Sequence, residues 1–137
     1  MAFWLIKSEP SAYSWDEMLQ ECRASWDGVR NYQAANNMKA MKCGDHACFY
    51  HSNEGREIVG IVIVVKEYYP DPTDASCRFG MVDVQAVKPM KNPVSLNAIK
   101  ANPVLVDLPL VRQSRLSVMP IRDHEWKILL EMGKTTL

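Results

Sequence analysis

The chain has 137 residues, of which 47% are apolar and 23% charged, and its formal net charge at pH 7 is zero. This length is typical of one domain that buries about two-thirds of the surface of its unfolded chain, so we expect a single domain over residues 1–137. No apolar run approaches the roughly 20 residues of a membrane span, and the balanced charge gives no general attraction to polyanions.

The first third of the sequence predicts one strand and two helices. Residues 3–6 are apolar, as in a short buried strand. In "SWDEMLQEC", Ser14 and Glu17 have the spacing of a capping box, and the apolar residues that follow recur on one helical face. A second helix is predicted in "RNYQAANNMKAMKCGD", capped near Asn31 and ended by Gly44.

The rest of the chain predicts strands followed by helices. "HACFYHSN" and "EIVGIVIVVKEYY" are separated by residues 54–56, as in a hairpin, and "RFGMVDVQAVKPM" predicts a further strand. Ser95 is expected to cap a short helix, "LVRQSRLSVMPI" contains the last loop and strand, and Asp123 is expected to cap a closing helix that ends at Gly133. This order indicates an α+β fold with a curled or barrel-like sheet.

The cysteines and the N-terminus bear on cofactors and compartment. The four cysteines show no C-x-x-C pair, and "CGDHAC" has no second pair at zinc-like spacing. We therefore expect no metal and no cofactor. Free thiols suit a reducing compartment, and the first residues lack the basic segment of a signal peptide. These features predict a cytoplasmic protein that makes no membrane contact.

Four stretches place polar groups beside aromatic residues where a strand ends or a helix begins. They are Lys7-Ser8-Glu9, "WDGVRNY" from Trp26, "FYHSN" from Phe49, and "RQSRLSV" from Arg112. An aromatic ring next to hydrogen-bonding groups suits a flat heterocycle, because a base stacks on the ring. The stretch from Val84 to Arg122 holds six basic residues and one acidic residue, which suits weak phosphate attraction.

Several of these residues also have a purely structural interpretation. The other three tryptophans are expected in the core; they are Trp4, Trp15 and Trp126. Trp26 precedes an Asp-Gly turn and either lines a site or packs inside. His51 either packs inward beside Phe49 or belongs to a site.

Together, the motifs resemble a known family. "WLIKSEP…YSW", "WDGVRNYQAANNMKAMKCGD", "FYHSN", "IVGI…VVKEYYPDPT" and "LVRQSRLSVMPI…EW" are similar to the EVE domain of the thymocyte nuclear protein family, from Phe3 to about Gly133. The start of the chain almost at the first strand resembles the bacterial type. The resemblance implies a PUA-like fold, with a curled mixed sheet or small barrel and surrounding helices. It also implies recognition of modified bases in DNA, with methylated or hydroxymethylated cytosine as candidates.

Each polar stretch has an expected role in binding such a base. Trp26, with Tyr32 or Tyr50, would stack on the base. Its edge would be recognised by Ser8, Glu9, Asn31 and Ser52. Flanking phosphates would be held by Lys7, Arg30, Arg112 and Arg115. His51, Asn53 and Ser117 complete the expected site.

A more distant similarity to YTH domains implies that Lys7, Ser8 and Glu9 form one wall of the pocket. It also implies that Trp26 is the stacking face and that residues 50–53 form the opposing side. Those domains commonly carry an uncharged polar residue in place of Glu9, and "YHSN" lacks their second cage tryptophan. The missing tryptophan argues against N6-methyladenine as the ligand. A carboxylate at Glu9 could accept from the exocyclic amine of cytosine.

Three functions remain open from the sequence. The first is a non-enzymatic, monomeric module that binds DNA or RNA carrying a modified base. The second is an enzyme acting on a nucleotide or small metabolite, with Glu9 or His51 as acid–base and Ser8 or Ser52 orienting the substrate. The third is a scaffold for another protein, which would require a large exposed apolar patch.

Overall fold

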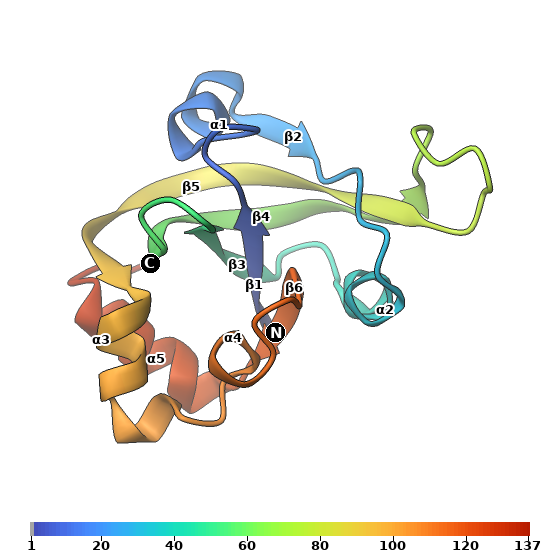
Figure 1. Cartoon of the computed structure of the whole chain (residues 1–137). Helices are drawn as coiled ribbons and strands as arrows, with labels where there is room; N and C mark the ends of the chain where they lie inside the picture. Colours follow the sequence, from blue (N-terminus) through green and yellow to red (C-terminus); the bar gives the residue numbers. More distant parts are fainter. Residues whose placement is uncertain (1) are drawn as a thin grey trace.

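A six-stranded mixed sheet organises the computed structural model, which describes residues 2–137. The strands are β1 (Phe3–Ser8), β2 (Arg23–Ser25), β3 (His46–His51), β4 (Glu57–Pro70), β5 (Gly80–Ser95) and β6 (Val118–Ile121). The helices are α1 (Trp15–Glu21), α2 (Tyr32–Ala40), α3 (Leu96–Ala101), α4 (Pro109–Arg112) and α5 (Asp123–Met132), with a 3₁₀ turn η1 (Pro103–Leu105). Figure 1 shows the elements in chain order.

The strands are ordered β2-β5-β4-β3-β1-β6 across the sheet. β1 pairs in parallel with β3 and antiparallel with β6, and every other pair is antiparallel. The long β4–β5 ribbon arches across the molecule (Figure 1), and its register shifts at several points. β2 and β6 form the two edges, so the described strands make a curled open sheet. The predicted α+β class is confirmed, and the closed-barrel alternative is not formed.

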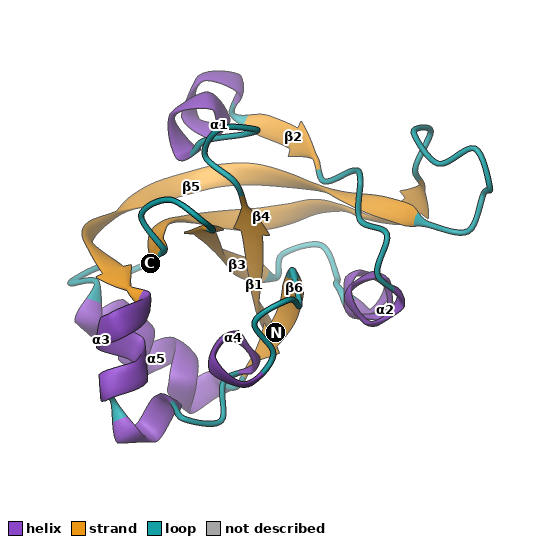
Figure 2. Ribbon diagram, in the orientation of Figure 1, coloured by secondary structure: helices purple, strands orange, loops and turns teal. Residues whose placement is uncertain are grey.

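The core lies between the sheet and the helices. Figure 2 shows α3, α4 and α5 gathered below the sheet, whereas α2 lies apart from them on the right of the view. Trp4 is 5% exposed, and Trp126 of α5 is 3% exposed and stacks on Phe3 with ring centroids 4.5 Å apart. Trp15 packs edge-on against the fully buried Phe49. The three tryptophans predicted to be core residues are therefore in the core.

The helix starts follow the sequence signals with one exception, whereas α2, expected to end at Gly44, ends at Ala40 with Met41 as its C-cap. The Ser14 hydroxyl accepts from the Glu17 amide at 3.2 Å, so the predicted capping box is present. Ser95 accepts from the Ala98 amide and caps α3 as expected. The prediction for α5 is wrong by one residue: Arg122 is the N-cap, and Asp123 is already helical.

The "CGDHAC" segment has a structural role. Asp45 is 3% exposed and accepts from the Trp4 indole N–H at 3.0 Å, from the Ala2 amide and from the Lys42 amide. This carboxylate therefore joins the start of β1 to the turn before β3. All four cysteines are free. Within residues 2–137, the helices are too short or too polar to cross a membrane.

Candidate functional site

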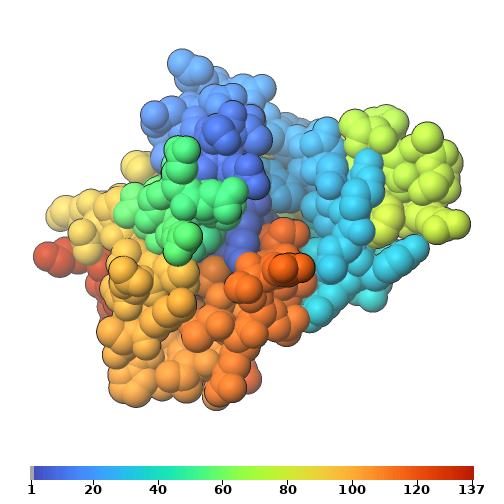
Figure 3. Space-filling view, in the orientation of Figure 1, coloured from blue at the N-terminus to red at the C-terminus, as the bar shows by residue number. Residues whose placement is uncertain are grey.

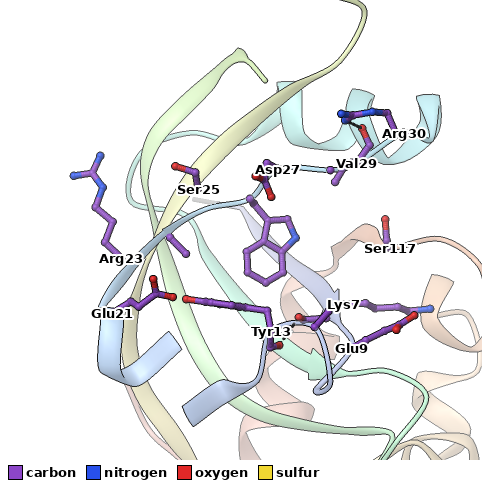
Figure 4. A pocket seen from close by; sticks show the side chains of 15 residues that line it. Lys7, Glu9, Tyr13, Glu21, Arg23, Ser25, Asp27, Val29, Arg30 and Ser117 are labelled. Carbon is purple, nitrogen blue, oxygen red and sulfur yellow. Dashed lines mark hydrogen bonds between the residues drawn. The ribbon is translucent and has the colours of Figure 1, made fainter. Parts of the chain in front are cut away.

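A pocket of about 650 Å³ opens where β1 ends beside β2. Figure 4 shows its lining. Residues 7–9 form one wall, and Ala12 and Tyr13 of the following loop form the next. Residue 21 and residues 23–30 line the opposite side, and Ser117 completes the rim. The β1–β6 pairing brings Ser117 here, because its carbonyl oxygen accepts from the Lys7 amide at 2.9 Å.

Two aromatic rings form a corner of the pocket. Trp26 is 9% exposed, and its ring lies nearly perpendicular to the Tyr13 ring, at 82° and with centroids 6.2 Å apart. Phe49 supports Trp26 from the core at 5.6 Å, and the Trp26 amide donates to the Val82 carbonyl at 2.7 Å. Because the two pocket rings are perpendicular, a flat ligand can stack on one and meets the other with its edge.

Three carboxylates line the pocket without a cationic partner. They belong to Glu9, Glu21 and Asp27, and none of them forms an ion pair within residues 2–137. All three residues are exposed. The pocket therefore presents hydrogen-bond acceptors to a ligand, which suits amino groups and repels phosphate oxygens.

The cations that line the pocket are already engaged. Arg23 contacts Asp83 at 2.9 Å, and Lys7 Nζ donates to the Ser114 carbonyl at 2.8 Å. Burial lowers the pKa of Lys7. Both cations are thus bound to groups of the protein itself and stabilise the pocket walls.

Tyr13 and Ser8 connect the two sides of the β1–α1 loop. Figure 4 shows the Tyr13 hydroxyl pointing toward the Glu21 carboxylate. Burial, followed by the proximity of Glu21, raises the pKa of Tyr13, so its hydroxyl keeps its proton at neutral pH. The Ser8 hydroxyl donates to the Tyr13 carbonyl at 2.5 Å, which leaves the Ser8 oxygen available only as an acceptor.

Asp71 lies in the loop between β4 and β5. It holds in place the pocket loop, which is the segment 26–31 between β2 and α2. Its buried carboxylate accepts from the Gly28 amide at 2.8 Å, from Arg30 Nη1 at 3.0 Å, and from the Thr73 amide and hydroxyl at 2.8 and 2.6 Å. Burial alone would raise the pKa of Asp71, but the hydrogen bonds from Thr73, Gly28 and Arg30 outweigh it and lower the pKa. Gly28 has φ +78°, a conformation that glycine adopts without strain.

Six of the predicted site residues meet in this pocket: Lys7, Ser8, Glu9, Trp26, Arg30 and Ser117. Of these, Arg30 is tied to Asp71, and its guanidinium lies over the Phe79 ring at 5.7 Å. That these six residues contact a base or a phosphate stays a prediction.

The "YHSN" residues lie outside the pocket lining. Tyr50 is 3% exposed and packs in the core. His51 Nε2 accepts from the Trp15 amide at 3.0 Å, which satisfies a donor at the start of α1. Ser52 and Asn53 form the turn after β3, and the Ser52 amide donates to the Ser8 carbonyl. Their position against β1 supports the pocket wall from behind.

The remaining predicted residues surround α2 and the segment before β6. Asn31 caps α2 by accepting from the Ala34 amide at 2.9 Å. Tyr32 is 61% exposed and lies against Phe79, with ring centroids 5.0 Å apart. Arg112 and Arg115 line a separate hollow together with Asn31.

Sequence reasoning missed most of the far wall. Tyr13, Glu21, Arg23, Ser25 and Asp27 line the pocket but were not predicted as site residues. Tyr13 carried one signal that could have found it, since it is an aromatic residue four positions after the end of the first polar stretch.

The two alternative acid–base residues of the enzyme hypothesis lie in different places. Glu9 lines the pocket, whereas His51 packs against α1 with Nε2 engaged. Burial lowers the pKa of His51, against the opposing effect of Glu57 and Asp16.

The scaffold hypothesis would require one large apolar patch. The exposed large apolar side chains come from five separate segments; they are Leu19, Tyr32, Val87, Val104, Val106 and Leu137.

Comparison with known proteins identifies the family. The EVE domain matches residues 2–132. Mouse thymocyte nuclear protein 1 is 36% identical over 97% of this chain and 74% of that protein. A structure from the bacterium Rhodopseudomonas palustris is 52% identical, with a TM-score of 0.93 over 98% of this chain and 94% of its own. Human THYN1, solved in complex with DNA containing 5-methylcytosine, is 33% identical, with a TM-score of 0.92 over 100% of both chains.

A more distant structure agrees in fold alone. The YTH domain of a Zygosaccharomyces rouxii protein is 15% identical, with a TM-score of 0.61 over 99% of this chain and 88% of its own. The fold is PUA-like, as the sequence motifs implied. This chain belongs to the EVE domain family.

Proposed function

We propose that the protein binds a nucleobase extruded from a nucleic-acid strand, with a modified cytosine in DNA as the candidate base. The observation that carries the proposal is the combination, in one pocket, of the Trp26–Tyr13 corner with unpaired carboxylates. Its volume of about 650 Å³ is within the range of small-molecule sites. Human THYN1, a relative of similar fold, was solved with DNA containing 5-methylcytosine.

The acceptors in the pocket favour cytosine over thymine or uracil. The exocyclic amine of cytosine donates hydrogen bonds, and carboxylates accept them, whereas the corresponding oxygen of thymine would face a carboxylate. Glu9 is exposed and unpaired at the end of β1, so it can take this role without losing another contact. A methyl or hydroxymethyl group on the base would pack against an aromatic edge.

A titration with three cytosine variants tests the proposal. Short single- and double-stranded oligonucleotides carry cytosine, 5-methylcytosine or 5-hydroxymethylcytosine at one position, in DNA and in RNA. We expect a modification-dependent affinity that falls about fivefold in Glu9→Gln, because the neutral amide oxygen that remains is a weaker acceptor than the carboxylate by about 1 kcal/mol. Glu131→Gln, which alters an exposed carboxylate on α5, is the matched control. Equal binding of all three bases by the wild type would contradict the proposal.

The stacking surface needs a variant that keeps the fold. Truncating the largely buried Trp26 to alanine would cost about 3–5 kcal/mol of stability, so lost binding would be ambiguous. Trp26→Phe retains an aromatic ring with less stacking area, and thermal unfolding checks whether the variant is folded. We expect weaker binding of every oligonucleotide with a base in the pocket.

We also propose that the protein acts as a monomer in the cytoplasm. The four free cysteines support a reducing compartment. DNA and RNA are compared directly in the titration above.

A further inference from the structure

A second hollow of about 330 Å³ lies beside the base pocket. Asn31 and Gln33 at the start of α2 line one side, and residues 112–116 line the other. Figure 3 shows the orange segment that contains residues 112–116 next to the cyan segment that contains α2. The Asn37 side chain donates to the Val118 carbonyl at 2.7 Å, so α2 is fixed against the strand that follows this segment.

The hollow differs from the base pocket in its charge. Its lining holds two arginines and three amide side chains, and no carboxylate. Arg112 is engaged by Asp107 at 3.0 Å and by the Val106 carbonyl. Arg115 is exposed and forms no ion pair within residues 2–137. Arg115 therefore has its guanidinium available for an anion, and the amides supply further donors.

The hollow and the base pocket share a wall. Lys7 lines the base pocket, and its Nζ donates to the carbonyl of Ser114, which lines the hollow. Arg30 and Ser117 line the pocket, and their chain neighbours Asn31 and Leu116 each lie nearer the hollow. A ligand that enters the pocket with its base thus has the hollow next to its backbone.

We propose that this hollow binds the sugar–phosphate backbone next to the base in the pocket, with Arg115 contacting a phosphate. The inference rests on the proposed function and deepens it: the ligand is a strand, not a free nucleoside. Anionic phosphates are excluded from the carboxylate-lined pocket and accepted by the adjacent hollow. Contacts to phosphates position a strand, whereas contacts to the base specify it.

The test combines a salt titration with a charge-removing variant. Arg115→Ala is compared with wild type and with Lys127→Ala, which removes an exposed cation from α5. We expect Arg115→Ala to bind modified and unmodified oligonucleotides about tenfold more weakly. We also expect the slope of log affinity against log salt to decrease by about one. The ratio between modified and unmodified strands stays unchanged, and Lys127→Ala behaves as wild type.

A free nucleoside, 5-methyl-2′-deoxycytidine, is the second probe. It should bind wild type and Arg115→Ala equally, and more weakly than the strand. An unchanged salt slope in Arg115→Ala, or a changed ratio between modified and unmodified strands, would overturn the inference. If the wild type binds modified and unmodified strands equally, the proposed base recognition fails. A loss on every strand confined to Arg115→Ala would still support the hollow as a backbone site.

Discussion

Asp71 offers the sharpest test of how the pocket loop is held, through the substitution Asp71→Asn. The asparagine keeps one oxygen and most of the shape, but its amide group cannot accept. If the amide faces Thr73, the threonine hydroxyl can turn to accept from it, and the partly buried Thr73 N–H loses its partner. The oxygen that remains still accepts from Gly28 and Arg30, but without a charge.

The magnitude follows from these contacts. The unpaired Thr73 donor is only partly buried and costs about 1 kcal/mol, the lower end of the range for buried donors, and each remaining hydrogen bond weakens by about 1 kcal/mol when its acceptor becomes neutral. Arg30 is 38% exposed and recovers part of its loss from water. We therefore expect the free energy of unfolding to fall by about 3 kcal/mol, which lowers Tm by about 10 °C.

Urea unfolding measures the effect, with an unchanged m value as the sign that only stability has changed. Asp107→Asn is the matched control, because Asp107 also lies 3.0 Å from an arginine, but both side chains of that pair are exposed. We expect this control to lose less than about 1 kcal/mol. If Asp71→Asn loses no more than the control, the carboxylate does not hold the loop.

Two further predictions concern residues behind the pocket. Gly60→Ala should lower the free energy of unfolding by about 2–3 kcal/mol, because the new Cβ would lie 2.3 Å from the Trp15 ring; an unchanged urea midpoint would contradict this close packing. Stability should also fall as pH drops below about 6.5, because His51 has a lowered pKa in the folded state and its protonation removes the acceptor for the Trp15 amide. His51→Asn should reduce this pH dependence between pH 5 and about 7, and equal slopes in both proteins would show that His51 is not its source.

Local signals predicted most elements of the fold. Alternating or continuous apolar residues marked β1, β3, β4 and β5, and the Ser14–Glu17 pair marked α1. β2 gave no such signal, because Arg23 and Ser25 are exposed and only Ala24 is partly buried. The pairing of β2 with β5 also depends on residues about 60 positions away. The open or closed form of the sheet was likewise undetermined, since it depends on which strands meet at the edges.

The site was predictable where it coincides with the end of a strand. The residues after the apolar run of β1 lie in the pocket, as does Trp26. Tyr50 was expected there, but the strand continues through it and buries its side chain. Arg30 looked like a free cation because its partner, Asp71, is 41 residues away. Long-range polar contacts of this kind leave no local pattern.

The position of β1 between β3 and β6 determines the order in which the protein can be completed during synthesis. β1 is translated first, but one of its two neighbours consists of Val118–Ile121. Until those residues leave the ribosome, one edge of the strand that contains Trp4, Leu5 and Ile6 has no partner, and an unpaired apolar edge promotes association with other chains. The pocket also forms only after β6 has been made, because the Lys7 amide can donate to the Ser117 carbonyl only when β6 docks on β1. A nascent chain therefore acquires this pocket only after the segment up to β6 has been made.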